Sequence, residues 1–130
     1  MVKPINNPAS ERAVLSGIIQ HGSDAFIDVD DIIDVQTFTL EENQIIYTCL
    51  KRVLSKSSIV DLPSVLSAAQ DLGLQEVFNE KISSDHIGAL AKLEVELDNV
   101  RQHAVKLKKL DVARDIRSKI RKINSDIGDV

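Results

Sequence analysis

Four side chains in this sequence are of the histidine and cysteine types that hold structural zinc, and the cysteine could also act as a nucleophile. They are the three histidines, His21, His86 and His103, and the single cysteine, Cys49. A tetrahedral zinc site brings about four such ligands together, and these residues are far apart in the sequence, so we expect no metal site. Cys49 lies among the apolar residues of a predicted helix, where a buried and unreactive thiol is the ordinary outcome.

Glycines and carboxylates could form two further kinds of site, for phosphate and for calcium. A P-loop needs glycines ahead of a Lys-Ser or Lys-Thr pair, so that backbone N–H groups can hold phosphates, and no glycine of the chain has that spacing. The sequence also lacks the G-x-G-x-x-G and H-E-x-x-H motifs. Five aspartates cluster between Asp24 and Asp34 without the spacing of a calcium loop. We therefore predict a solvated acidic face, no catalytic residue, no metal and no cofactor in this chain.

Basic residues gather in the last third of the chain. Eight Lys or Arg lie between Lys106 and Lys122 against two Asp, although the formal net charge is −4. A domain that holds the DNA backbone usually has a basic surface overall, and no aromatic residue follows Phe78 to stack on bases. We therefore expect any DNA contact to be weak or indirect. A helical nucleic-acid-binding module that uses the basic run is an alternative, which a salt-dependent shift of single-stranded DNA would favour.

The composition predicts a single all-α domain. The chain has 130 residues, of which 43% are hydrophobic and only 3% aromatic, with five Gly and three Pro. A core of Leu, Ile, Val and Ala with few turn residues is typical of packed helices and not of a β-sandwich. No apolar run approaches the ~18 residues that span a bilayer, no signal peptide is evident, and one cysteine fits a reducing compartment. We expect a cytoplasmic protein that does not contact membranes.

Helix-capping residues divide the first 90 residues into short amphipathic helices. The predicted helix starts, in chain order, are Asn7-Pro8, Ser23, the T-x-x-E capping box Thr39–Glu42, and Asp61. Gly22 and Gly73 are placed to end the first and fourth of these helices. In the second helix we expect Phe26, Ile27, Val29, Ile32 and Ile33 to point inward. One short helix of a turn or two is expected at 75–81.

The last part of the chain changes to a heptad pattern, which predicts a long helix. Apolar residues recur three and four apart as far as Leu107, slip at Leu110 and resume from Ala113. We divide the chain into a flexible lead-in (1–7), a head of orthogonal helices (8–90) and a long helix that forms part of a helical hairpin arm (91–127), with a break expected near 91–98.

A helix of about 28 residues would be roughly 42 Å long, and a head of this size cannot cover its whole apolar stripe. The stripe therefore predicts self-association by burial against a symmetric partner. The residues expected to make this contact are Leu107, Leu110, Ile116, Ile120 and Ile123.

Four stretches together resemble the N-terminal domain of DnaB-type replicative DNA helicases of bacteria and phages. The stretches are, in order, Pro8–Gly17, Phe38–Tyr47, Val60–Gly73 and Asn99–Arg114. The first matches the family's opening helix of Pro, Glu and Val-Leu-Gly-Gly with Ser16 for the first Gly, and in the last His103 replaces a Tyr. The resemblance covers about residues 8–127. The family's Gly-Gly-Tyr-Leu region is replaced around 81–90, and the loop before the long helix lacks its usual breakers.

The resemblance implies a role in DNA replication. In such helicases this domain forms a collar above the motor ring, pairs meet through the helical hairpins, and three pairs complete a hexamer. The collar also docks the C-terminal domain of primase and can receive a helicase loader. ATP and Mg²⁺ belong to the separate motor domain, so the parent would be an ATP-dependent helicase whereas this chain would be non-catalytic.

The family's second hairpin arm would follow residue 127. We therefore expect either a piece of a longer helicase or a stand-alone phage regulator that imitates the collar to load or block a host helicase. A reading frame that continues into a motor domain would favour the first, and a stop codon after Val130 would favour the second.

Overall fold

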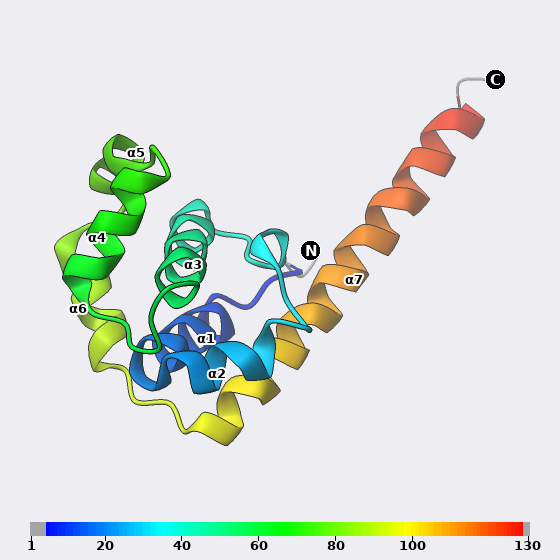
Figure 1. The fold of residues 1–130 in the computed structure, drawn as a ribbon. Coiled ribbons are helices and arrows are strands. Elements are labelled where there is room, and N and C mark those ends of the chain that lie inside the picture. Colours follow the sequence, from blue (N-terminus) through cyan, green and yellow to red (C-terminus); the bar gives the residue numbers. More distant parts are fainter. Residues whose placement is uncertain (1–4, 129–130) are drawn as a thin grey trace.

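The structure is a computed structural model that describes residues 5–128, with side chains described as far as residue 125. Within that range the chain is all helical, with 77% of the described residues in helices and no strand. The elements are α1 (Pro8–His21), α2 (Ser23–Val29), the 3₁₀ turn η1 (Val35–Thr37), α3 (Glu41–Leu54), α4 (Leu62–Asp71), α5 (Gln75–Lys81), α6 (Ser84–Lys92) and α7 (Leu97–Gly128). The predicted all-α fold, a helical head followed by a long C-terminal helix, is confirmed (Figure 1).

Local capping accounts for most of the helix boundaries. The Asn7 side chain accepts a hydrogen bond from the backbone N–H of Ser10, and Asp61 accepts one from that of Ser64, so both caps form as the sequence predicts. Gly22 and Gly73 follow their helices at φ values of 60° and 71°, where a residue with a β-carbon is strained. A β-carbon on Gly22 would also overlap the Ser58 carbonyl oxygen, so this turn requires glycine.

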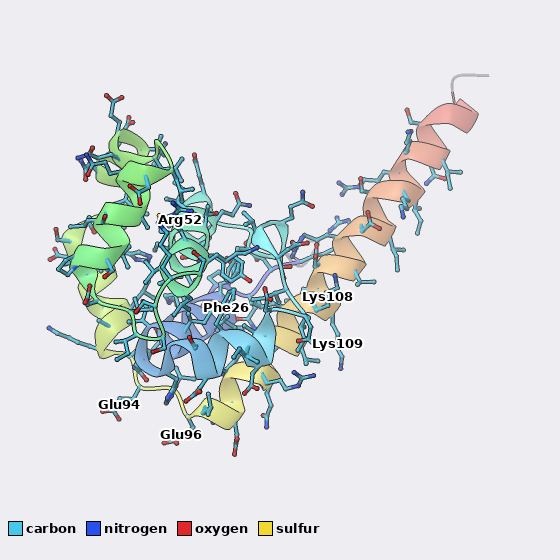
Figure 2. All side chains as sticks on the ribbon, viewed as in Figure 1. Phe26, Arg52, Glu94, Glu96, Lys108 and Lys109 are labelled. Carbon is cyan, nitrogen blue, oxygen red and sulfur yellow. The ribbon has the colours of Figure 1, made fainter. Side chains whose placement is uncertain are left out.

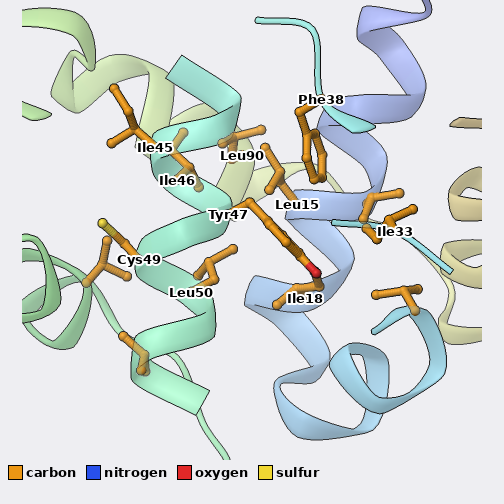
Figure 3. Close-up of a cluster of buried hydrophobic side chains, with 14 of the residues drawn as sticks. Leu15, Ile18, Ile33, Phe38, Ile45, Ile46, Tyr47, Cys49, Leu50 and Leu90 are labelled. Atoms are coloured by element: carbon orange, nitrogen blue, oxygen red, sulfur yellow. The ribbon is translucent and has the colours of Figure 1, made fainter. Parts of the chain in front are cut away.

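The core of the head lies between α1 and α3, and the remaining helices surround these two (Figure 3). Leu15 and Ile18 of α1 pack opposite Ile46 and Leu50 of α3, and all four are fully buried. Tyr47 is the main aromatic residue of this core; its ring lies 5.0 Å from that of Phe38, centroid to centroid. Helix α7 crosses the far side of α1 and also contacts α2.

The long helix begins later than the sequence pattern suggests. Residues 93–96 lie outside any helix, between α6 and α7, so the expected break is present and α7 starts at Leu97 instead of residue 91. The first part of α7, as far as Arg114, is in contact with the head, and the rest of the helix projects away from it (Figure 1). Its 32 residues extend over about 48 Å at 1.5 Å per residue.

Two details of the predicted helix starts are wrong. Ser23 is already within α2, whose N-cap is Gly22 and has no side-chain cap. The Thr39–Glu42 capping box does not form, because α3 begins at Glu41 and the Thr39 hydroxyl donates to the distant carboxylate of Glu11 instead.

The prediction of which residues of the second helix point inward is also only partly correct. Val29 and Ile33 are buried, but the Ile27 side chain is 71% exposed. Helix α2 ends at Val29, so the periodic pattern read through Ile33 spans a helix and a turn.

Of the predicted lead-in, residues 1–4 lie outside the described residues, and the Ile5 carbonyl accepts a hydrogen bond from Arg114. None of the helices in the described part of the chain combines the length and the apolar character that a membrane crossing requires.

Candidate functional site: the outward face of the long helix

Close packing against α1 fixes the start of α7. At the crossing point, a β-carbon on Gly17 would overlap Cγ2 of Val100. Glycine therefore lets the two helices approach closely, and Val100, Ala104 and Leu107 of α7 are buried in the core as a result. We call these three residues the inner face of α7.

A second attachment holds α7 where it leaves the head. The Arg114 guanidinium donates from Nη1 to the Ile5 carbonyl at 2.8 Å and from Nη2 to the Thr37 carbonyl at 3.1 Å. Its Nη2 also lies 3.4 Å from the Asp111 carboxylate. One side chain thus ties the helix to the N-terminal segment and to η1, which sets the direction in which the rest of α7 projects.

The carboxylate of Glu11 organises the head around the start of α3, and sequence reasoning missed this role. Glu11 is fully buried, and its oxygens accept from the Thr39 hydroxyl at 2.6 Å, the Asn43 amide at 3.1 Å, and the backbone N–H groups of Thr39 and Leu40 at 3.1 and 3.4 Å. It therefore anchors the segment that leads into α3, and the Asn43 side chain in the first turn of that helix, to α1. The signal in the sequence was the Glu of the opening-helix motif, Pro8–Gly17.

The second face of α7 is apolar and exposed. Its members are Val105, Val112, Ile116, Ile120 and Ile123, which are between 37% and 57% exposed. Because an α-helix turns by about 100° per residue, these five side chains lie within about 80° of one another around the axis. We call them the outward stripe. Leu107 of the inner face lies about 180° from Ile116 on the same reckoning.

The residues predicted to mediate self-association therefore divide between two faces. Ile116, Ile120 and Ile123 belong to the outward stripe. Leu107 is 2% exposed and packs in the core of the head, so it is not available to a partner, and Leu110 is half-buried beside it. The register slip seen at Leu110 in the sequence is the point where the apolar pattern changes from the inner face to the outward stripe.

Basic side chains flank the outward stripe. Figure 2 labels Lys108 and Lys109 where α7 leaves the head, and shows the side chains beyond them projecting away from the rest of the chain. Within the described residues Lys108 pairs with Asp111 at 4.0 Å and Lys119 with Asp115 at 3.0 Å, which leaves an excess of positive charge on the distal helix. A partner on this face would meet isoleucines bordered by lysines and arginines.

The residues with possible chemistry do not come together in the part of the chain that the structure describes. No group of three or more His, Cys, Asp or Glu residues there could hold a metal ion. The His21 imidazole donates from Nε2 to the Val95 carbonyl, 2.7 Å away in the segment before α7. His103 of α7 pairs with the Ser10 hydroxyl of α1 at 3.1 Å. Burial raises the pKa of the Cys49 thiol to about 11, which keeps it protonated and unreactive at neutral pH.

Two other features of the head are a buried tyrosine hydroxyl and a small apolar cavity. Burial, with smaller contributions from Asp30 and Asp34, raises the pKa of the Tyr47 hydroxyl, which has no hydrogen-bond partner. An apolar cavity of about 140 Å³ lies between α1, α3, α4 and α6, lined by side chains such as Ile19, Leu50 and Ile87. It has little polar lining to orient a substrate.

The fold and this face define a class: an all-helical head with a long C-terminal helix that carries an exposed apolar stripe. The family model of the DnaB-like helicase N terminal domain matches residues 3–109, which is most of the chain. The chain belongs to this family, and the resemblance carried by its motifs is confirmed. The N-terminal domain of this family is non-catalytic. The match ends at residue 109, before most of the outward stripe, and no match was found among curated proteins.

Proposed function

We propose that this chain is the collar domain of a replicative DNA helicase, which assembles with further copies of itself and docks primase during DNA replication. The observation that carries the proposal is the outward stripe, because four of its five members are beyond 40% exposed on a helix that the head does not cover. Family membership supports the setting in a helicase.

The energetic case rests on the apolar area that a partner would cover. Full burial of an exposed Ile or Val side chain contributes roughly 1.5–3 kcal/mol, and these side chains are already about half covered by their own helix. Each would then contribute roughly 1 kcal/mol. Together, five such residues on each of two copies offset part of the entropy that is lost on association. One residue alone would contribute too little to do so.

Primase is the second proposed partner, through its C-terminal domain, and a helicase loader is a third. ATP and Mg²⁺ would be bound by a motor domain and not by the helices described here, and contact with DNA would be weak or indirect. The whole assembly would work in the cytoplasm. The hexamer, as three pairs of collar domains, follows from the family setting and is part of the same proposal.

Sedimentation of a matched pair of variants tests self-association. Ile116→Asp with Ile120→Asp places two charges in the outward stripe, and Ser118→Asp with Ser125→Asp places the same two charges on the opposite side of the same helix. We expect the first pair to dissociate the protein at concentrations where the parent and the second pair remain associated. Helical content measured by circular dichroism should be unchanged in both. Equal sedimentation of all three proteins would overturn self-association through this face.

Primase docking needs a separate measurement. The mass of the protein in solution is measured with and without the C-terminal domain of the cognate primase. A larger complex of defined stoichiometry is expected, and the absence of any mass change at high micromolar concentrations of both proteins would contradict docking.

A further inference from the structure

The apolar cavity of about 140 Å³ in the head is open to solvent on one side. Its deep end is formed by Ile19 of α1 and by Ile46 and Leu50 of α3. Its mouth lies between α4 and α6, because Leu62 and Ala91, which line it from these two helices, are exposed. A dry apolar cavity of about 150 Å³ can admit benzene, so this cavity has room for one Leu, Ile or Phe side chain. We call it the head slot.

The surface around the mouth of the head slot is a shallow groove with two unlike walls. Leu62 and Leu66 lie four residues apart on α4, so they form one row along that helix, and they are 47% and 44% exposed. Helix α6 contributes the small residues Ser84, Gly88 and Ala91, and a β-carbon on Gly88 would meet no atom within 4 Å. Because the distance between packed helices depends on the side chains at the contact, a second helix can approach this wall closely. A leucine row, a wall of small residues and one deep apolar slot suit an amphipathic helix.

Charge indicates which kind of helix would bind there. Residues 61–92, which contain α4, α5 and α6, have five Asp or Glu and only two Lys. One of these lysines, Lys81, already lies 4.0 Å from the Glu41 carboxylate, and Asp61 lines the head slot itself. Residues 1–105 as a whole have sixteen Asp or Glu and eight Lys or Arg. An acidic surface attracts a basic partner and repels an acidic one.

We propose that the groove between α4 and α6 binds a basic amphipathic helix of another protein, which inserts one Leu, Ile or Phe side chain into the head slot. The inserted side chain supplies most of the affinity, and the acidic surroundings favour Lys or Arg next to it. The groove shares no residue with the outward stripe, so the inference goes beyond the proposed self-association and does not depend on it. A second copy of this chain, whose distal helix is also basic and apolar, is the alternative occupant that the test must separate.

Three synthetic helical peptides of about 15 residues, four turns long, serve as probes. The first has Leu along one face and Lys elsewhere, the second replaces the central Leu by Ala, and the third replaces every Lys by Glu. Isothermal titration at low salt measures their affinity for the protein. We expect the first peptide to bind, the second to bind at least about tenfold more weakly because it lacks the buried side chain, and the third not to bind.

Variants of the protein locate the peptide. Ala91→Phe fills the mouth of the head slot and should weaken binding of the first peptide at least about tenfold. Ala89→Phe is the matched control, since this exposed residue lies on the same helix about 160° away around the axis. Asp61→Asn keeps an N-cap side chain for α4 but removes the charge, and it should weaken binding roughly two- to fivefold at low salt. Circular dichroism should show the same helical content in all three variants.

Each contrary result overturns a defined part of the inference. No binding of the first peptide at about 1 mM, the weak end of measurable affinity, would overturn the site. Equal binding of the Leu and Ala peptides, or no loss in Ala91→Phe, would overturn insertion into the head slot. Binding that is lost in the Ile116→Asp, Ile120→Asp protein would place the peptide on the outward stripe instead. If Ala91→Phe abolished self-association in sedimentation, the occupant would be a second copy, whereas a protein that is monomeric throughout leaves this inference standing.

Discussion

The two faces of α7 differ in what supports them. The inner face, Val100, Ala104 and Leu107, is covered by the head, and Gly17 allows α1 to approach it closely. The outward stripe has similar residue types but no cover within the described chain. Apolar side chains on one helix therefore serve two purposes, and only their position around the axis separates intramolecular packing from a surface available to a partner.

This difference has an energetic consequence. Residues of the inner face stabilise the folded monomer, because each loses its contact with water on folding. Residues of the outward stripe add little to the stability of the monomer, and their contribution appears only when a partner covers them. Substitutions that separate stability from association are therefore the direct way to test the comparison.

The largest effect on stability is expected at the inner face. Leu107→Ala should lower the free energy of unfolding by about 3 kcal/mol, since it removes a buried side chain and leaves a cavity. Ile116→Ala on the outward stripe should change it by less than about 0.5 kcal/mol under monomeric conditions. Urea denaturation of both variants at low protein concentration measures the difference. Similar losses at the two positions would remove the distinction between the faces.

A smaller loss is expected where α1 supports the inner face. Gly17→Ala inserts a methyl group into the contact with Val100, and overpacking of this kind costs about 2 kcal/mol unless the helices separate. Gly88→Ala in α6 is the matched control, because no atom lies within 4 Å of the added β-carbon. It should stabilise the protein by about 0.5–1 kcal/mol through helix propensity. Thermal denaturation shows whether each variant is less or more stable than the parent protein. If Gly17→Ala left the stability unchanged, the crossing of α1 and α7 would not be closely packed.

Local signals account for the features that could be predicted from the sequence. Asn7 and Asp61 cap the helices that directly follow them, and Gly73 follows the end of α4 at a positive φ. These residue types therefore indicate the helix boundaries directly. The long helix and the apolar residues of its distal part also follow from periodicity. These features depend on residues within a few positions of one another.

The features that could not be predicted depend on contacts between residues that are far apart in the sequence. Thr39 donates to Glu11, which lies 28 residues before it, so local spacing could not show that this hydroxyl bonds to α1 and not within a capping box of α3. Leu107 and Ile116 both fit a heptad pattern, but only the position of the head shows which face of the helix is covered. Contact through the distal isoleucines therefore stays a prediction, whereas Leu107 is buried in the head.

The smallest of the three effects is expected at the junction of the two regions of α7. Arg114→Lys keeps the positive charge but cannot reach the Ile5 and Thr37 carbonyls with the same planar fork. Because the Arg114 side chain is partly exposed, the loss of stability should be about 1 kcal/mol.

The same substitution should loosen the distal helix more than the head. Amide hydrogen exchange is expected to speed up from about residue 108 onward, while the amides of α1 and α3 keep their protection, since Arg114 is the last attachment before α7 projects freely. Uniform acceleration across the whole chain would mean that Arg114 supports the head as a unit. Unchanged exchange along α7 would mean that packing at Leu107 alone fixes the direction of the helix.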